Sequence, residues 1–236
     1  VDGGAGIDTI LRPSSGDYTA DVFHHIDNIE IWSLADAAAQ TIIIDADVIR
    51  GLTDGPNTLT HDDAALVIIG DEGDVVQIAG GEWSFDGDHV LPIDLSLQYT
   101  IRVVDGDGVA LYVDEFVRLE VTRDDTSVLL IGGSSNETLN GTGGDDLIDG
   151  RGGSDQSFAG AGDDTLVFDE DDTVMDGGAG LDTLEFLVGQ DIDLSFSGNL
   201  SGIERIDLRS NGEADTLDLN IRDILDFVTD NELDNF

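Results

Sequence analysis

Four nonapeptides follow one another at residues 132–167: GGSSNETLN, GTGGDDLID, GRGGSDQSF and AGAGDDTLV. A degraded copy, DEDDTVM (169–175), and a complete copy, GGAGLDTLE (177–185), come next. They share the pattern Gly-Gly-x-Gly-x-Asp-x-apolar-x, and its register drifts by one residue in places. Glycine permits positive φ and close backbone approach, so each copy predicts a tight turn followed by a very short strand. Repeats of this kind predict a solenoid of stacked coils.

An acidic residue recurs at the sixth position of the pattern. Alternate turns fall on opposite edges of such a solenoid, so residues about 18 apart are expected to stack. This spacing predicts two acidic ladders, which are Asp145–Asp164–Asp182 and Glu137–Asp155–Asp172. Carboxylates stacked at strand spacing, about 4.8 Å, repel one another unless a cation lies between them. Calcium suits carboxylates mixed with turn carbonyls, because it takes flexible oxygen coordination.

The eighth position of the pattern is expected to point into the solenoid. It is apolar in most copies, and a polar residue takes the place in the third copy. The predicted inward positions are Leu139, Leu147, Ser157, Leu166, Val174 and Leu184.

A longer repeat is marked by DGGAGIDTI at Asp2–Ile10 and DGGAGLDTL at Asp176–Leu184, which differ only by exchanges of Ile and Leu. Related series follow each copy: 25–34 resembles 201–210, and 40–54 resembles 215–230. We therefore expect a slice through a tandem array. Its parts would be the end of a preceding roll (1–10), a β-rich domain (11–131), the calcium-binding roll (132–190) and the start of a second β-rich domain (191–236).

Between the copies, residues 11–131 show short apolar runs bounded by Gly, Asp and Asn, which predict strands and turns. A short helix is predicted at DADVIRGL, with Asp45 or Asp47 as N-cap, and in its echo NIRDILDF, with Asn220. Trp32 and Trp83 are expected in the core. The predicted fold class is all-β: a parallel β-roll joined to a β-rich domain, with at most short helices.

The charge of the chain is strongly one-sided. Its 236 residues hold 52 Asp and Glu, nine Arg and no Lys, giving a formal charge of −43. Such a chain repels itself on compaction and needs bound cations. The charge argues against nucleic acid and disfavours an anionic membrane surface as partners, because too few positive groups would neutralise phosphates. No apolar run is long enough for membrane insertion, and without cysteine no disulfide forms.

Residues 132–185, with 2–10, resemble the RTX (hemolysin-type calcium-binding) family. The resemblance implies a right-handed parallel β-roll that holds several calcium ions between successive turns. It implies carboxylate ligands at Asp145, Asp155, Asp164 and Asp182, and Glu137 and Asp172 complete the predicted metal set although their rows depart from the pattern. Carbonyl ligands are implied near Gly141, Gly143, Gly160, Gly162, Gly178 and Gly180.

The longer unit resembles the repetitive and C-terminal regions of large bacterial RTX adhesins. The phrases that carry this likeness are 203–208, 47–54, and 70–76 with Trp83 and 111–113. The resemblance implies type I secretion of an unfolded chain, which folds in the calcium outside the cell and stays secreted or on the cell surface. Its partners would be calcium, neighbouring modules of the same chain, and an extracellular glycan or surface.

No catalytic motif stands out. HExxH and GxSxG are absent, His24 and His25 are adjacent, and His61 and His89 are isolated. The turns DEGD (71–74), DGD (86–88) and DGDG (105–108) are expected to be plain turns or extra calcium sites. We therefore expect a non-catalytic, calcium-binding structural segment. The alternatives are the accessory roll of a secreted protease or lipase whose catalytic domain lies elsewhere, and a glycan-binding module.

Overall fold

The structure is a computed structural model that describes residues 2–4, 7–11, 26–34, 38–53, 60, 62, 64–93, 96–123, 126–186, 192–193, 199–208 and 217–218. The chain divides into two compact units, Val1–Asp124 and Asp125–Phe236. The described residues form twenty short strands and one helix, so the predicted all-β class is confirmed.

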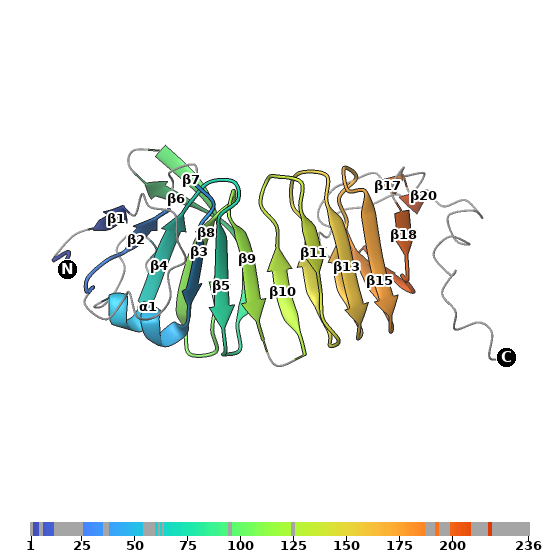
Figure 1. Ribbon diagram of the computed structural model, residues 1–236, viewed down its shortest axis with the longest axis horizontal. Coiled ribbons are helices and arrows are strands. Elements are labelled where there is room, and N and C mark those ends of the chain that lie inside the picture. Colours follow the sequence, from blue (N-terminus) through green and yellow to red (C-terminus); the bar gives the residue numbers. More distant parts are fainter. Residues whose placement is uncertain are drawn as a thin grey trace. The chain divides into compact units, whose positions relative to one another are not determined.

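The second unit contains a roll built from two parallel sheets. One sheet holds β10 (Val128–Ile131), β12 (Leu147–Asp149), β14 (Thr165–Val167), β16 (Thr183–Glu185) and β19 (Arg205–Asp207). The other holds β11 (Thr138–Asn140), β13 (Gln156–Ala161), β15 (Val174–Ala179) and β18 (Asn199–Ser201). Figure 1 shows β11, β13 and β15 lying side by side. Consecutive strands alternate between the sheets, so two strands make one coil.

Strand register sets the length of the coil. Leu147 pairs with Leu129 on one side and with Thr165 on the other, and Gln156 pairs with Thr138 and Val174. Each of these steps spans 18 residues, or two nonapeptides, which is the coil length that the repeat predicts. A further two-residue strand, β17 (Ile192–Asp193), pairs in parallel with β20 (Leu217–Asp218).

The interior of the roll is apolar. Its buried residues are Leu130, Leu139, Ile148, Ala159, Leu166, Phe168, Met175, Leu184, Phe186 and Ile203. Two of the predicted inward positions were wrong by one residue. Ile148 and Met175 point inward, and the predicted Leu147 and Val174 are only half-buried. Ser157 keeps its predicted inward position and is 1% exposed.

The first unit also winds through two stacks of parallel strands. The first stack is β1 (Thr9–Leu11), β2 (Ile31–Ser33), β4 (Ala64–Ile69) and β8 (Val109–Asp114), and the second is β3 (Thr41–Ile44), β5 (Val75–Ala79) and β9 (Arg118–Thr122). The coils are longer than in the roll. They contain the helix α1 (Ala46–Leu52) and an antiparallel hairpin, β6 (Ser84–Ile93) with β7 (Ser96–Val104). The hairpin extends the first stack through β8.

The helix prediction is confirmed at α1. Asp45 is the N-cap, and its Oδ1 accepts the backbone N–H of Val48 at 2.8 Å. Trp32 and Trp83 are buried, as expected for core residues. The helix predicted in the echo at 220–227 lies outside the described residues.

The strand pairing itself is duplicated along with the long sequence repeat. Thr9 pairs with Ile31, and Thr183 pairs with Arg205, so the same length of chain separates the partners in both copies. The bridge of Asp2 to Asp27 likewise matches the pairing of Asp176 with Ser201. Asn28 and Gly202, which occupy equivalent places in the two copies, both have a positive φ, of 56° and 60°. The repeated sequence thus folds into the same local pairing twice.

Candidate metal-binding turns

Acidic residues occupy the turns at both edges of the roll. The turns from β10 to β11, β12 to β13 and β14 to β15 carry Glu137, Asp155 and Asp172. The turns of the other edge carry Asp146, Asp164, Asp182 and Glu204. Each set forms a ladder in which one member is contributed by each coil.

Every rung of these ladders is the same hydrogen bond. The backbone N–H of one acidic residue donates to a carboxylate oxygen of the acidic residue one coil later. On the first edge, the N–H of Glu137 lies 2.7 Å from Asp155 Oδ1, and the N–H of Asp155 lies 3.0 Å from Asp172 Oδ1. The predicted ladder Glu137–Asp155–Asp172 is thus present as a chain of hydrogen bonds.

On the second edge the same bonds join Asp146 to Asp164 at 2.7 Å and Asp164 to Asp182 at 2.8 Å. The predicted ladder named Asp145 as the first member, and that placement was wrong by one residue. Asp146 is 18 residues before Asp164 and is buried, whereas Asp145 is exposed. Backbone pairing of β12 with β14 fixes this register, because Leu147 must lie opposite Thr165.

Asp145 belongs to a separate, exposed ladder. Its Oδ1 accepts the N–H of Asp163 at 2.9 Å, and Asp163 Oδ1 accepts the N–H of Leu181 at 3.0 Å. These carboxylates reach forward to the next coil, whereas the buried carboxylates accept from the previous coil. Adjacent coils are therefore linked in both directions by neighbouring aspartates.

Four buried carboxylates of the roll keep one oxygen without a hydrogen bond. The Oδ2 atoms of Asp155, Asp164, Asp172 and Asp182 are buried and unpartnered, and these residues are at most 3% exposed. Two other ladder members differ, because an N–H group of their own turn donates to the carboxylate. Glu137 Oε2 accepts from the N–H of Gly133 at 2.8 Å, and Asp146 Oδ2 accepts from that of Thr142 at 2.5 Å.

The environment of the four carboxylates opposes their negative charge. Burial is the main cause that raises their pKa above the ordinary 3.8, to about 7 for Asp172 and about 6 for Asp182. Neighbouring carboxylates raise the pKa further, while the backbone N–H donors act in the opposite direction. A bound cation would offset the cost of burying these charges and the repulsion between them, because it pairs with the negative charge and coordinates the unpartnered oxygen.

Backbone carbonyls lie between the coils beside the second ladder. A Cβ atom on Gly178 would lie 2.1 Å from the carbonyl oxygen of Gly160, and one on Gly180 would lie 1.8 Å from that of Gly162. All four glycines have positive φ. The carbonyls of Gly160 and Gly162, two of the predicted ligands, thus point at the next turn. The space between is open because Gly178 and Gly180 have no side chain.

The remaining predicted carbonyl positions are arranged differently. Thr142 and Gly144, rather than Gly141 and Gly143, direct their carbonyls at Gly160 and Gly162. This is the same one-residue shift as at Asp146. Gly141 instead packs against Asp146, whose Oδ2 would lie 2.5 Å from an added Cβ. Gly178 and Gly180 lie in the last nonapeptide turn.

The donor set is made of hard oxygen atoms, which calcium prefers. Within the described ranges, no three His, Cys, Asp or Glu side chains gather into one cluster. The carboxylates instead occur one per turn, so turn carbonyls must complete any coordination shell. The residues present fit a calcium ion on this basis, and the unpartnered Oδ2 atoms are the strongest reason.

The acidic turns of the first unit have partners of their own. Asp74, in the turn DEGD, is fully buried and accepts from the N–H of Gln40 at 2.9 Å and of Asp71 at 3.0 Å. Like a ladder aspartate, it directly precedes a strand and accepts an N–H from the preceding coil. The sequence analysis did not predict this equivalence. The signal was present, because Gly70 and Gly73 precede it at a spacing similar to that of the nonapeptides.

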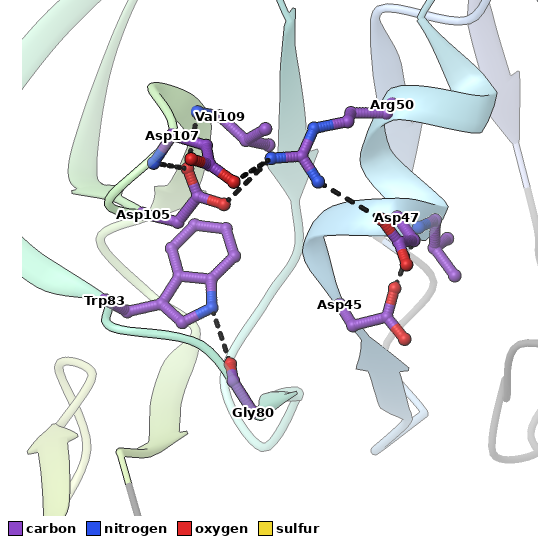
Figure 2. A network of polar contacts seen from close by, with 9 residues as sticks. Asp45, Asp47, Arg50, Gly80, Trp83, Asp105, Asp107 and Val109 are labelled. Atoms are coloured by element: carbon purple, nitrogen blue, oxygen red, sulfur yellow. Dashed lines mark hydrogen bonds and ion pairs between the residues drawn. The ribbon is translucent and has the colours of Figure 1, made fainter.

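The turn DGDG is held by an arginine. Arg50 on α1 lies 3.2 Å from Asp105 Oδ2 and 3.3 Å from Asp107 Oδ2, and Figure 2 shows its guanidinium between the helix and this turn. Asp105 Oδ1 accepts the backbone N–H groups of Asp107 and Val109. A guanidinium therefore supplies the positive charge at this turn.

A second arginine serves the turn DGD. Arg102 contacts Asp86 and lies 2.9 Å from Asp62 Oδ1. The hydroxyl of Tyr112 donates to Asp62 Oδ2 at 2.7 Å. His24, His25 and His61 lie outside the described residues, and only the backbone of His89 is described.

Comparison with known proteins identifies the repeats. Residues 131–166 match the RTX calcium-binding nonapeptide repeat in four copies. The chain therefore carries RTX repeats, a module that binds calcium. No curated protein and no solved structure matched the chain significantly. In the part of the chain that the structure describes, no helix is long and apolar enough to span a membrane.

Proposed function

We propose that this chain is a non-catalytic, calcium-stabilised segment of a secreted or cell-surface RTX adhesin-like protein, and that calcium outside the cell drives the folding of its roll. The observation that carries the proposal is the set of four buried aspartates with an unpartnered oxygen. Without a cation, each of them places a poorly satisfied carboxyl group inside the folded roll.

Asp155, Asp164, Asp172 and Asp182 would hold calcium together with turn carbonyls such as those of Gly160 and Gly162. Calcium supplies charge neutralisation and oxygen coordination there. The residues around it do the rest: glycines admit the carbonyls, backbone N–H groups orient each Oδ1, and the apolar core excludes water.

Calcium concentration would decide whether the roll folds. A site with a dissociation constant near 10⁻⁴ M in about 10⁻² M calcium contributes about 2.7 kcal/mol to folding. Several such sites add up to the stability of an ordinary domain, about 5–15 kcal/mol. In low calcium, the charge of −43 favours an open chain.

The duplicated pairing supports a place in a tandem array over an accessory role beside a catalytic domain. An accessory roll has no need to repeat the junction with the residues that follow it. Here that junction occurs twice, at Thr9–Ile31 and Thr183–Arg205. The segment would extend and stiffen a longer chain and present its neighbouring modules.

Hydrogen exchange of the whole chain, with calcium and with a chelator, tests the proposal. We expect amides of the roll, such as those of Asp155 and Asp164, to lose protection when calcium is removed. The amide of Gln40 is the internal control, because Asp74 holds it with both carboxylate oxygens satisfied. Equal protection of the roll in both conditions would show that calcium does not drive its folding.

A further inference from the structure

The chain that follows the last nonapeptide makes a different kind of coil. The rung from Asp164 to Asp182 spans 18 residues, whereas the next rung, from Asp182 to Glu204, spans 22 residues. Its turn is the short Gly202–Ile203–Glu204 between β18 and β19. Glu204 nevertheless takes the place of a ladder aspartate. Its Oε2 accepts the N–H of Asp182 at 2.8 Å.

Oxygen atoms of two coils converge beside this rung. Asp182 is 0% exposed, and its Oδ2 has no hydrogen-bond partner. A Cβ on Gly177 would lie 2.8 Å from that Oδ2 and 2.0 Å from the carbonyl oxygen of Gly202. An unpartnered carboxylate oxygen and a carbonyl from the next coil therefore share a space that Gly177 leaves open.

The same arrangement occurs a second time in the chain. Glu30 Oε2 accepts the N–H of Asp8 at 2.8 Å, again across 22 residues. Asp8 Oδ2 is also buried and unpartnered. At Gly3, a Cβ would lie 2.1 Å from the carbonyl oxygen of Asn28 and 2.7 Å from Asp8 Cβ.

We propose that each of these junctions binds one calcium ion, at the point where a nonapeptide turn meets the coil that follows it. One ion would be held by Asp182, the Gly202 carbonyl and Glu204, and the other by Asp8, the Asn28 carbonyl and Glu30. No arginine forms an ion pair with these four carboxylates among the described residues. The inference rests on the proposed function, because it extends the calcium ladder by one coil.

The competing explanation is that each glutamate is a plain hydrogen-bond cap. Substituting Glu204→Gln and Glu30→Gln separates the two, since the amide oxygen of glutamine still accepts the N–H and only the charge is lost. Glu82→Gln is the matched control, because Glu82 is exposed and lies outside both junctions. Circular dichroism at saturating calcium checks that each variant folds.

The test is a calcium titration of the whole chain by equilibrium dialysis. We expect Glu204→Gln and Glu30→Gln each to lose one bound ion, or to weaken one site about tenfold, and the double variant to lose two. The control should keep the wild-type number of ions. If Glu204→Gln does not fold, Glu30→Gln alone decides the question.

The outcomes separate the two proposals. If both glutamine variants bind as many ions as the control with equal affinity, the glutamates are caps and the junction sites do not exist. If the unaltered chain binds no calcium at all, the proposed function itself fails.

Discussion

The backbone N–H of Asp146 donates to Oδ1 of Asp164, one coil further along the roll, at 2.7 Å. This bond uses one carboxylate oxygen to hold the neighbouring coil, and the other oxygen of Asp164 stays buried and unpartnered. One residue type therefore does two tasks in the roll, and substitutions can separate them.

Asp164→Asn should weaken calcium binding about tenfold or more, because it removes the charge and keeps an oxygen that can accept the N–H of Asp146. Asp163→Asn, at the adjacent exposed position, should change the affinity by much less. In metal-free buffer, Asp164→Asn should make the roll more stable, since a neutral amide is less costly to bury than a carboxylate. Calcium titration followed by urea unfolding measures both effects. An equal loss of affinity in the two variants would contradict the prediction.

Without calcium, the roll should be more stable at pH 4 than at pH 7.5. Burial raises the pKa of Asp172 to about 7 and of Asp182 to about 6, so the folded state binds more protons than the unfolded state. This contribution is complete below the ordinary pKa of 3.8 and is lost as the pH rises through 6 to 7. Thermal melts in metal-free buffer measure the trend, and saturating calcium should reverse it. A metal-free melting temperature that rises from pH 4 to pH 7.5 would count against the prediction.

Gly180→Ala should destabilise the roll by about 2 kcal/mol or more, because an added Cβ would lie 1.8 Å from the carbonyl oxygen of Gly162 and φ is +149°. Gly143→Ala is the matched control. No atom lies within 4 Å of a Cβ at Gly143, and its φ is not positive. Urea unfolding in saturating calcium compares them. If both variants unfold at the same midpoint, the coils are not packed as closely as described.

Arg50→Met should destabilise the first unit by about 1 kcal/mol, because it leaves the nearly buried carboxylate of Asp105 without its cation. Asp107→Asn removes a neighbouring contact at a side chain that is 84% exposed, and it should have a smaller effect. Neither change should alter the calcium affinity of the roll. Unfolding in saturating calcium, followed by the fluorescence of the buried Trp32 and Trp83, measures the difference. A larger effect from Asp107→Asn would show that the network is held differently.

The sequence allowed the roll to be predicted because a nonapeptide repeat fixes both the coil length and the edge on which each aspartate lies. It misplaced one ladder member by one residue. Asp145 and Asp146 are adjacent and equally acidic, so composition does not distinguish them, although only Asp146 lies at the sixth position of its nonapeptide and 18 residues before Asp164. The choice is made by backbone pairing, which requires Leu147 to lie opposite Thr165.

The course of the first unit was harder to predict, for two reasons. Its coils differ in length, since Ile31 pairs with Val67 and Val67 pairs with Tyr112, so no fixed period appears in the sequence. The apolar runs of β4 and β8 are buried on both faces and lack the alternation that reveals a sheet face. The ion pairs of this unit could not be predicted from the sequence either, because Arg50 and its partner Asp105 are separated by 55 residues.

The buried ladder also gives the roll a polarity. Each coil offers an N–H to the coil after it and receives one from the coil before it, so a partly assembled roll has unlike ends. In this ladder one end presents acceptors and the other presents donors, whereas the exposed ladder of Asp145 and Asp163 runs the opposite way. Glu204 supplies the acceptor that the final nonapeptide turn requires. The last nonapeptide turn is therefore hydrogen-bonded to the residues that follow it, and the N–H of Asp182 is satisfied by protein and not by solvent.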